Sequence, residues 1–260
     1  LRAARRGGRR RSRRPRDHGG GRPFLRAAAG RGARRRRRSR RAAALLPALH
    51  GAGGGSPRRR RARRRALSGM RIVGGRLGGR TLAAPGAKGG GAAHLRPTGD
   101  RVREALFNHL AHGGYADPPA PEGMRVLDLF AGVGALGFEA LSRGAVWCVF
   151  VDDHAPSRAL IRENAEALGL IGATKIWRRD ALRLGPCRSA PFDLAFLDPP
   201  YRAGLAPRAL EGAAREGWLA PNGLAVVELS ADEAFAPPDG FSLEDDRRYG
   251  DTRIAVLRRG

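Results

Sequence analysis

After a Gly- and Pro-rich linker at 113–123, short apolar runs alternate with longer segments in which apolar residues recur every three or four positions. The short runs have strand length and strand-forming side chains, whereas the longer segments have helical periodicity. The pattern predicts strands over 125–130, 146–151, 174–177, 194–197 and 224–229, helices ending near 143 and covering 156–168 and 206–216, and a terminal hairpin of 241–247 and 252–257. Such alternation is typical of an α/β fold, a mostly parallel sheet with helices on both faces.

The segment 70–112 has a different pattern and forms a separate N-terminal part, ahead of the larger part 124–260. Two short apolar runs flank paired glycines, which predicts a small β-hairpin over 70–82. A helix is expected to open near Thr98, whose hydroxyl can cap the first turn. We expect Arg101 and Arg103 to lie off its apolar face, which would be formed by Val102, Ala105, Leu106 and Leu110.

The first 69 residues differ sharply in composition. They contain 26 arginines and one acidic residue, a net charge of +25, whereas 70–260 carries only +1. So few apolar residues cannot form a core, and we expect 1–69 to be disordered. The segment fits an RNA-binding arm, an organelle-targeting peptide, or a translated GC-rich stretch upstream of the first methionine, Met70, and we favour the last. The remaining positive charge falls in 70–104, at +5, so contacts with nucleic acid should concentrate there.

Cysteine and histidine usage excludes several kinds of site. Cys148 and Cys187 have neither disulfide-framework nor zinc-binding spacing and fit a reducing compartment. His109 and His112 have no third ligand nearby in sequence, so we expect no metal site. No apolar run approaches membrane-spanning length. These features favour a cytoplasmic protein.

Acidic residues stand at or just past the ends of four predicted strands: Asp128, Asp152, Asp180 and Asp198. Carboxyl ends of parallel strands share one edge, so these residues should meet where ligands bind in such sheets. The GxGxxG pattern at 132–137 opens a helix, and Asp152 follows it as an acceptor for two ribose hydroxyls, which indicates a nucleoside ligand. Asp128 would repel a pyrophosphate but attract an ammonium group. The pattern therefore favours S-adenosyl-L-methionine over a dinucleotide.

The tetrapeptide Asp198-Pro199-Pro200-Tyr201 ends the fourth predicted strand. Its two prolines remove two N–H donors, which leaves nearby carbonyls free to accept hydrogen bonds. The Asp198 carboxylate and the Pro199 carbonyl can accept two hydrogens of an exocyclic amine, while Tyr201 can stack on the base. A sulfonium is an excellent leaving group, so positioning should dominate methyl transfer. A base within folded nucleic acid must be swung out to reach such a pocket.

From Met70 onward, over about 190 residues, the sequence resembles the bacterial RsmD family. The segments that carry the resemblance are 70–75, 96–98, 100–108, 126–137, 192–201 and 248–252. That family methylates N2 of one guanine in 16S ribosomal RNA. The resemblance implies a class I, Rossmann-like S-adenosylmethionine-dependent methyltransferase whose last strand is antiparallel. It also implies 16S rRNA or an assembling small ribosomal subunit as partner, and we expect a monomer.

Position by position, the resemblance implies two sets of site residues. Those for the cofactor are Asp128, Phe130, Gly132, Gly134, Asp152, Asp180 and Ala181. Those for the guanine amine are Asp198, Pro199, Pro200 and Tyr201. A third set is expected to contact RNA because it lies in the positively charged part 70–104: Arg71, Arg76, Arg80, Arg96, Thr98, Arg101 and Arg103. Two positions depart from expectation: Gly99 stands where the family commonly has Thr, and Asp153 beside Asp152 offers a second candidate for the ribose, although the strand end favours Asp152.

Three other functions fit parts of the pattern. A DNA adenine-N6 methyltransferase would use the same tetrapeptide, but the sequence contains no separate DNA-recognition domain. A dinucleotide-dependent oxidoreductase would use the glycine turn, but no residues suited to hydride transfer accompany it. A non-enzymatic RNA-binding protein would depend on 1–69, and deletion of that segment would separate it from an enzyme.

Overall fold

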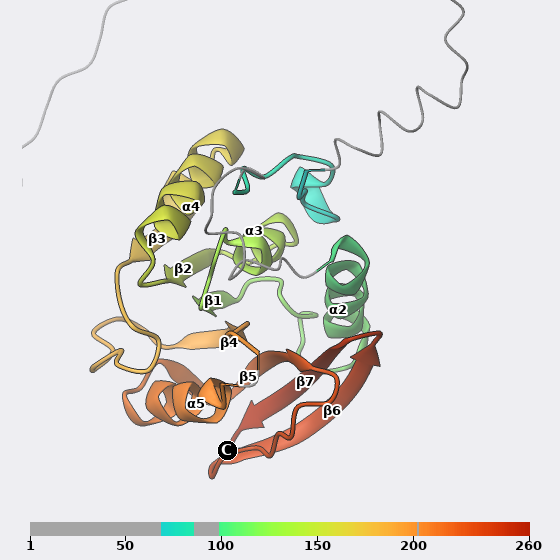
Figure 1. Cartoon of the computed structure of the whole chain (residues 1–260), viewed down its shortest axis with the longest axis vertical. Helices are drawn as coiled ribbons and strands as arrows, with labels where there is room; N and C mark the ends of the chain where they lie inside the picture. Colours follow the sequence, from blue (N-terminus) through green and yellow to red (C-terminus); the bar gives the residue numbers. More distant parts are fainter. Residues whose placement is uncertain (1–68, 86–98, 202) are drawn as a thin grey trace, which may run out of the picture. The chain divides into compact units, whose positions relative to one another are not determined.

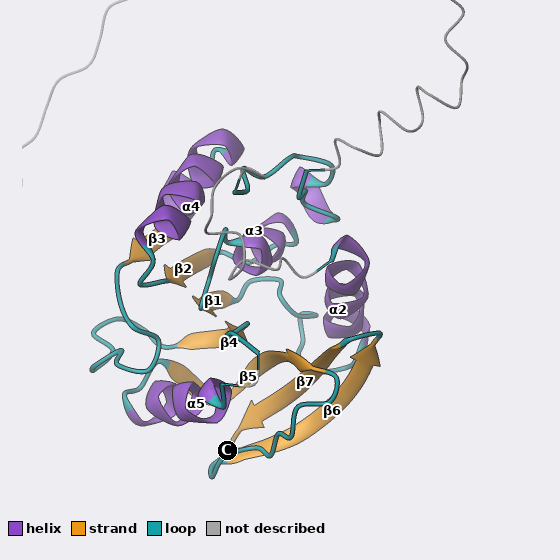
Figure 2. Ribbon diagram, in the orientation of Figure 1, coloured by secondary structure: helices purple, strands orange, loops and turns teal. Residues whose placement is uncertain are grey.

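The apolar runs pair into one seven-stranded sheet (Figures 1 and 2). The computed structural model describes residues 69–85, 99–201 and 203–260; the predictions for 1–68, Arg96 and Thr98 lie outside them. The strands are β1 Arg125–Leu129, β2 Trp147–Val151, β3 Thr174–Trp177, β4 Phe192–Leu197, β5 Leu219–Ser230, β6 Phe241–Tyr249 and β7 Thr252–Arg259. The helices are α2 Asp100–His112, α3 Ala135–Ser142, α4 Ala155–Leu168 and α5 Leu205–Arg215, with short 3-10 turns η1 Gly75–Leu77 and η3 Ile171–Ala173.

The strands are ordered β3-β2-β1-β4-β5-β7-β6. The first five in this order run parallel, and β7 lies antiparallel between β5 and β6. The predicted α/β sheet with an antiparallel last strand is confirmed. From β1 the chain moves outward to β2 and β3 and then returns to β4 on the other side. The strand order therefore reverses between the neighbouring strands β1 and β4. Ligands bind at such a switch point, beyond the carboxyl ends of the strands.

The helices cover both faces of the sheet (Figure 1). Side chains alternate between the two faces of a strand, so each strand contributes to two cores. Apolar residues of α2, α3 and α4 pack on one face, against residues such as Phe150 and Phe196. Apolar residues of α5 pack on the other face, against residues such as Leu127 and Leu197. Phe107 of α2 lies against Phe196 with ring centroids 5.5 Å apart, which fixes the N-terminal helix beside β4.

The N-terminal segment forms the predicted hairpin but differs from its prediction at the start of the helix. An antiparallel bridge joins Arg71 to Thr81, backbone hydrogen bonds join Ile72 to Arg80 and Leu82 to Met70, and the 3-10 turn η1 lies toward the closed end. Helix α2 begins at Asp100, and Gly99 occupies the N-cap position that was predicted for Thr98. No side chain caps this helix end. Asp100 instead places its carboxylate in the first turn, where the helix dipole favours a negative charge.

Candidate active site

The carboxyl ends of four adjacent strands meet at one edge of the sheet. Leu129 of β1 pairs with Val151 of β2 and with Leu197 of β4, and Leu197 pairs with Val227 of β5. The residues that follow these four therefore lie at one level: Phe130, Asp152, Asp198 and Glu228. The glycine turn and the Asp198 tetrapeptide share this edge, as the sequence predicted.

The acidic side chains of this edge gather on one face of the sheet. The face that α2, α3 and α4 cover includes Val126, Phe150, Phe196 and Val226. Two positions beyond each of these residues stands an acid: Asp128, Asp152, Asp198 and Glu228. Because side chains alternate along a strand, a spacing of two returns each acid to the same face. We call this group the rim acids.

The turn after β1 has an unusual backbone that one rim acid holds in place. Gly132 and Gly134 have φ angles of 57° and 82°, a left-handed conformation that favours glycine. Phe130 shares it, with φ 58°. Asp152 accepts a hydrogen bond from the Gly132 N–H through Oδ2, and another from the His154 N–H through Oδ1, both at 2.8 Å. Asp152 thus shapes the turn from the tip of β2.

Asp128 lies deeper, inside β1. Its buried carboxylate accepts a hydrogen bond from the Gly137 N–H, in the first turn of α3, at 3.0 Å. Burial raises the pKa of Asp128 well above its ordinary value; the hydrogen bond from Gly137 lowers it, and the nearby Asp152 carboxylate raises it further. Burial also raises the pKa of Asp152, against its two backbone hydrogen bonds, which lower it. A cationic ligand beside these acids would lower both pKa values.

The tetrapeptide directly follows the tip of β4. Pro199 is buried and Pro200 is exposed, while Asp198 and Tyr201 are partly buried. The Tyr201 hydroxyl donates a hydrogen bond to Oε1 of Glu228 at 2.9 Å. This bond ties the end of the tetrapeptide to β5 and sets the direction of the tyrosine ring.

Glu228 is a site residue that the sequence analysis missed, because it lies within the apolar run 224–229. Only 3% of its surface is exposed. Loss of hydration raises the pKa of Asp198 well above its ordinary value, and the carboxylates of Glu228 and Asp128 raise it further. A charged residue within an otherwise apolar run could have marked Glu228 as a candidate site residue. Its place beside Asp198, however, follows only from the pairing of β5 with β4.

Strand β3 contributes less to the rim. It ends at Trp177, and Asp180 stands three residues beyond this end. Asp180 is exposed and accepts a hydrogen bond from the Leu182 N–H at 2.9 Å, whereas Ala181 is buried. The cofactor contact assigned to Asp180 and Ala181 stays a prediction.

The basic residues that were predicted to contact RNA divide between the surface and the interior. Those on the surface are Arg71, Arg76, Arg80 and Arg101. Arg103 is buried instead, which contradicts the prediction that it lies off the apolar face of α2. Its guanidinium donates to the Arg71 carbonyl at 2.6 Å and to the Asp100 carboxylate at 2.8 Å, so its charge is compensated inside the protein. Arg103 therefore anchors the N-terminal segment to α2 and does not face solvent.

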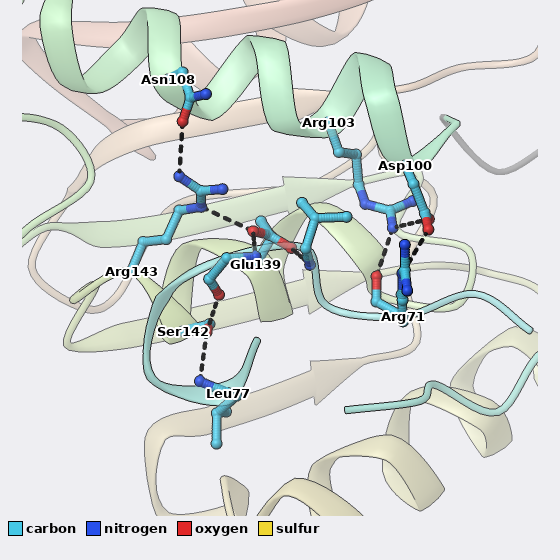
Figure 3. A network of polar contacts seen from close by, with 10 residues as sticks. Arg71, Leu77, Asp100, Arg103, Asn108, Glu139, Ser142 and Arg143 are labelled. Atoms are coloured by element: carbon cyan, nitrogen blue, oxygen red, sulfur yellow. Dashed lines mark hydrogen bonds and ion pairs between the residues drawn. The ribbon is translucent and has the colours of Figure 1, made fainter. Parts of the chain in front are cut away.

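A polar network also fastens the N-terminal segment to α3 (Figure 3). Glu139 of α3 is fully buried and accepts hydrogen bonds from the N–H groups of Val73 and Gly74, both at 2.8 Å. Arg143 Nε donates to the same carboxylate at 2.8 Å, and the Ser142 hydroxyl donates to the Gly74 carbonyl at 2.5 Å. Because α3 begins directly after the glycine turn, the network fixes the exposed arginines of this segment relative to the rim.

The strand order, the glycine turn after β1 and the rim acids together define a class I, Rossmann-like methyltransferase. The model of the family described as Conserved hypothetical protein 95 matches residues 70–258. The chain belongs to this family, the RsmD family. Among the described residues, no helix is long and apolar enough to cross a membrane, and no group of His, Cys, Asp or Glu is arranged to hold a metal ion.

Curated relatives and solved structures agree with this assignment. Ribosomal RNA small subunit methyltransferase D of Escherichia coli is 35% identical over 192 residues, which are 73% of this chain and 90% of that protein. The protein of the same name from Haemophilus influenzae is 34% identical, over 70% of this chain and 89% of its own length. The solved structure of a putative methyltransferase from Escherichia coli is 33% identical, with a TM-score of 0.60, over 73% of this chain and 97% of its own.

Proposed function

We propose that this protein transfers a methyl group from S-adenosylmethionine to the N2 amine of a guanine in small-subunit ribosomal RNA. The observation that carries the proposal is the pairing of β1 with β4, which sets the glycine turn beside Asp198. The names of the Escherichia coli and Haemophilus influenzae relatives support the RNA substrate. We expect a cytoplasmic monomer that acts on 16S rRNA or on an assembling small subunit.

The residues at the rim fit S-adenosylmethionine. The left-handed backbone at Gly132 and Gly134 is where a ligand approaches the main chain closely in glycine turns of this kind. Asp152, at the tip of β2, suits the two ribose hydroxyls, and the buried Asp128 suits the ammonium group of the methionine end. S-adenosylmethionine carries an ammonium and a sulfonium as well as its carboxylate, and positive charge beside these two acids would lower their raised pKa values. The remaining proposed contacts are with Phe130, Asp180 and Ala181.

The protein's own groups would orient the base. When bound, the cofactor supplies an electrophilic methyl group on a sulfonium. The Asp198 carboxylate and the Pro199 carbonyl accept the two hydrogens of the guanine N2 amine, and Tyr201 stacks on the ring. Positioning of this kind supplies most of the rate, because the leaving group needs no activation. In this proposal the Asp198 carboxylate also takes up the proton that the amine loses on methylation.

The exposed arginines of the N-terminal part form the proposed RNA-facing surface: Arg71, Arg76, Arg80 and Arg101. Residues 70–104 hold the excess positive charge of the chain after the first 69 residues. Phosphate contacts made by these side chains would position the RNA without reading its sequence. Binding should therefore weaken steeply as salt rises.

Methyl transfer from labelled cofactor tests the proposal directly. Purified protein is incubated with naked 16S rRNA and with small-subunit particles, and the modified nucleotide is mapped. We expect N2-methylguanine at one position. Methylation of adenine N6 in DNA would instead support the alternative activity, and absence of transfer to every substrate would reject a methyltransferase.

A variant pair tests the role of Asp198. Asp198→Ala should remove turnover while cofactor affinity stays nearly unchanged, because this carboxylate is assigned to the base and not to the cofactor. Asp239→Ala is the matched control, since Asp239 is an exposed acid just before β6, at the opposite edge of the sheet. Undiminished transfer by Asp198→Ala would reject the assigned role.

A further inference from the structure

Glu228 is a buried carboxylate that the proposed chemistry does not yet use. It interrupts the apolar strand β5, and its Oε1 accepts a hydrogen bond from the Tyr201 hydroxyl. An ionised carboxylate can accept about four hydrogen bonds, so one carboxylate can serve several donors at once. The negative charge of Glu228 lies close enough to Asp198 to raise the pKa of that residue. A ligand that offers several adjacent N–H donors could be held by both carboxylates.

Glu228 lies next to the proposed position of the base. Val227 pairs with Leu197, so Glu228 and Asp198 leave neighbouring strands at the same level and on the same face. Tyr201, the last residue of the tetrapeptide that is proposed to hold the base, donates a hydrogen bond to Glu228. The carboxylate therefore lies beside the place that the proposed function gives to the guanine amine.

The Watson–Crick edge of guanine carries three contiguous N–H donors, one on N1 and two on N2. Adenine offers two hydrogens on N6, but its N1 is an acceptor. A pair of carboxylates side by side matches the guanine edge. With adenine, one carboxylate would face the N1 lone pair. Because both the carboxylate oxygen and N1 are acceptors, neither would form a hydrogen bond there.

We propose that Glu228 is the specificity-determining residue of the site: it accepts the N1–H of guanine while Asp198 accepts a hydrogen of the N2 amine. The inference rests on the proposed function and adds the means by which guanine is chosen. The Tyr201 hydroxyl donates to Oε1 of the same carboxylate, so Glu228 also holds the end of the tetrapeptide. Preference for guanine over a base without N1–H is then a property of this one side chain.

The test compares guanine with 2-aminopurine at the mapped target nucleotide. 2-Aminopurine keeps the 2-amino group but has an acceptor at N1. Small-subunit particles are assembled from 16S rRNA that carries either base, made by ligation of a synthetic segment. Initial rates of methyl transfer are measured for the full-length protein and for two variants, Glu228→Gln and Tyr201→Phe. The fluorescence of 2-aminopurine reports entry of the base into the site independently of turnover.

The wild type should prefer guanine by roughly 10- to 100-fold, the range of one well-placed base contact. Glu228→Gln can turn its amide NH₂ toward the N1 of 2-aminopurine, so the preference should fall at least tenfold and the fluorescence change on binding should increase. Tyr201→Phe keeps the carboxylate and should keep the preference, whatever its absolute rate. Equal loss of preference in Tyr201→Phe would show that Glu228 acts merely by holding the tyrosine, which overturns the inference.

Failure of this inference is distinct from failure of the proposed function. If the wild type forms no N2-methylguanine, the proposed function itself is wrong. If it forms N2-methylguanine but the preference is the same in Glu228→Gln, only the role of Glu228 is rejected. Should Glu228→Gln not fold, the wild type alone decides: comparable rates on both bases overturn the inference, and a preference above tenfold supports it.

Discussion

Replacing Glu139 by alanine should detach the N-terminal segment from α3 while leaving the sheet in place. The carboxylate is fully buried and accepts three hydrogen bonds, from Val73, Gly74 and Arg143 (Figure 3). Alanine is a better helix former than glutamate, so α3 itself is not weakened. The whole loss of stability therefore comes from the contact between α3 and the N-terminal segment at 73–77.

The magnitude follows from the groups that lose their partner. Each backbone N–H left without an acceptor costs about 1–3 kcal/mol when buried, and the lower end applies to Val73 and Gly74 because both are partly exposed. Arg143 keeps some exposure and can turn toward water, so it adds little. With the lost packing of the side-chain methylenes, the sum is about 3 kcal/mol. For a folded part of this size the melting temperature should fall by about 6–12 °C.

Thermal unfolding, together with hydrogen exchange of the Val73 and Gly74 amides, measures this loss. Glu139→Gln should lower the free energy of unfolding by less. The amide oxygen can still accept from one of the two backbone N–H groups, but the amide NH₂ would face the other N–H. Glu104→Ala, which removes an exposed glutamate of α2, is the control and should leave the melting temperature unchanged. An unchanged melting temperature and unchanged exchange in Glu139→Ala would refute the reasoning.

Two further predictions concern the rim. Asp152→Ala should weaken cofactor binding by at least about 100-fold, since two charge-assisted hydrogen bonds are lost, whereas Asp153→Ala, which removes an exposed neighbour, should not. Equal affinities by calorimetry would mean that the ribose partner is wrong. The pKa of Asp198 is higher in the folded protein than in the unfolded chain, so the folded state binds this proton more tightly. The free energy of unfolding is therefore highest below the unfolded carboxyl pKa, and it falls as the pH rises through the raised pKa of the folded state. The melting temperature of Asp198→Asn minus that of the wild type should therefore grow with rising pH, and a pH-independent difference would contradict the assignment.

Local periodicity was enough to place most of the elements. The strand over 174–177 has the predicted bounds, and α4 and α5 begin one residue before their predicted starts. Strands β4 and β5 begin earlier than predicted, because residues before the apolar run still pair with a neighbour. The hairpin over 70–82 is also where it was predicted, and its pairing stays short because η1 and the paired glycines occupy its closed end.

By itself, the sequence determined the α/β architecture and the gathering of Asp128, Asp152 and Asp198 at one edge. It could do so because the carboxyl ends of parallel strands always share an edge, whatever their order. Only the tertiary structure decided that Glu228 stands level with Asp198, that Arg103 is buried, and that Glu139 holds the N-terminal segment. Each of these depends on which distant segments become neighbours and in what register. That information lies in the pairing of strands and helices, and no local pattern of apolar and polar residues contains it.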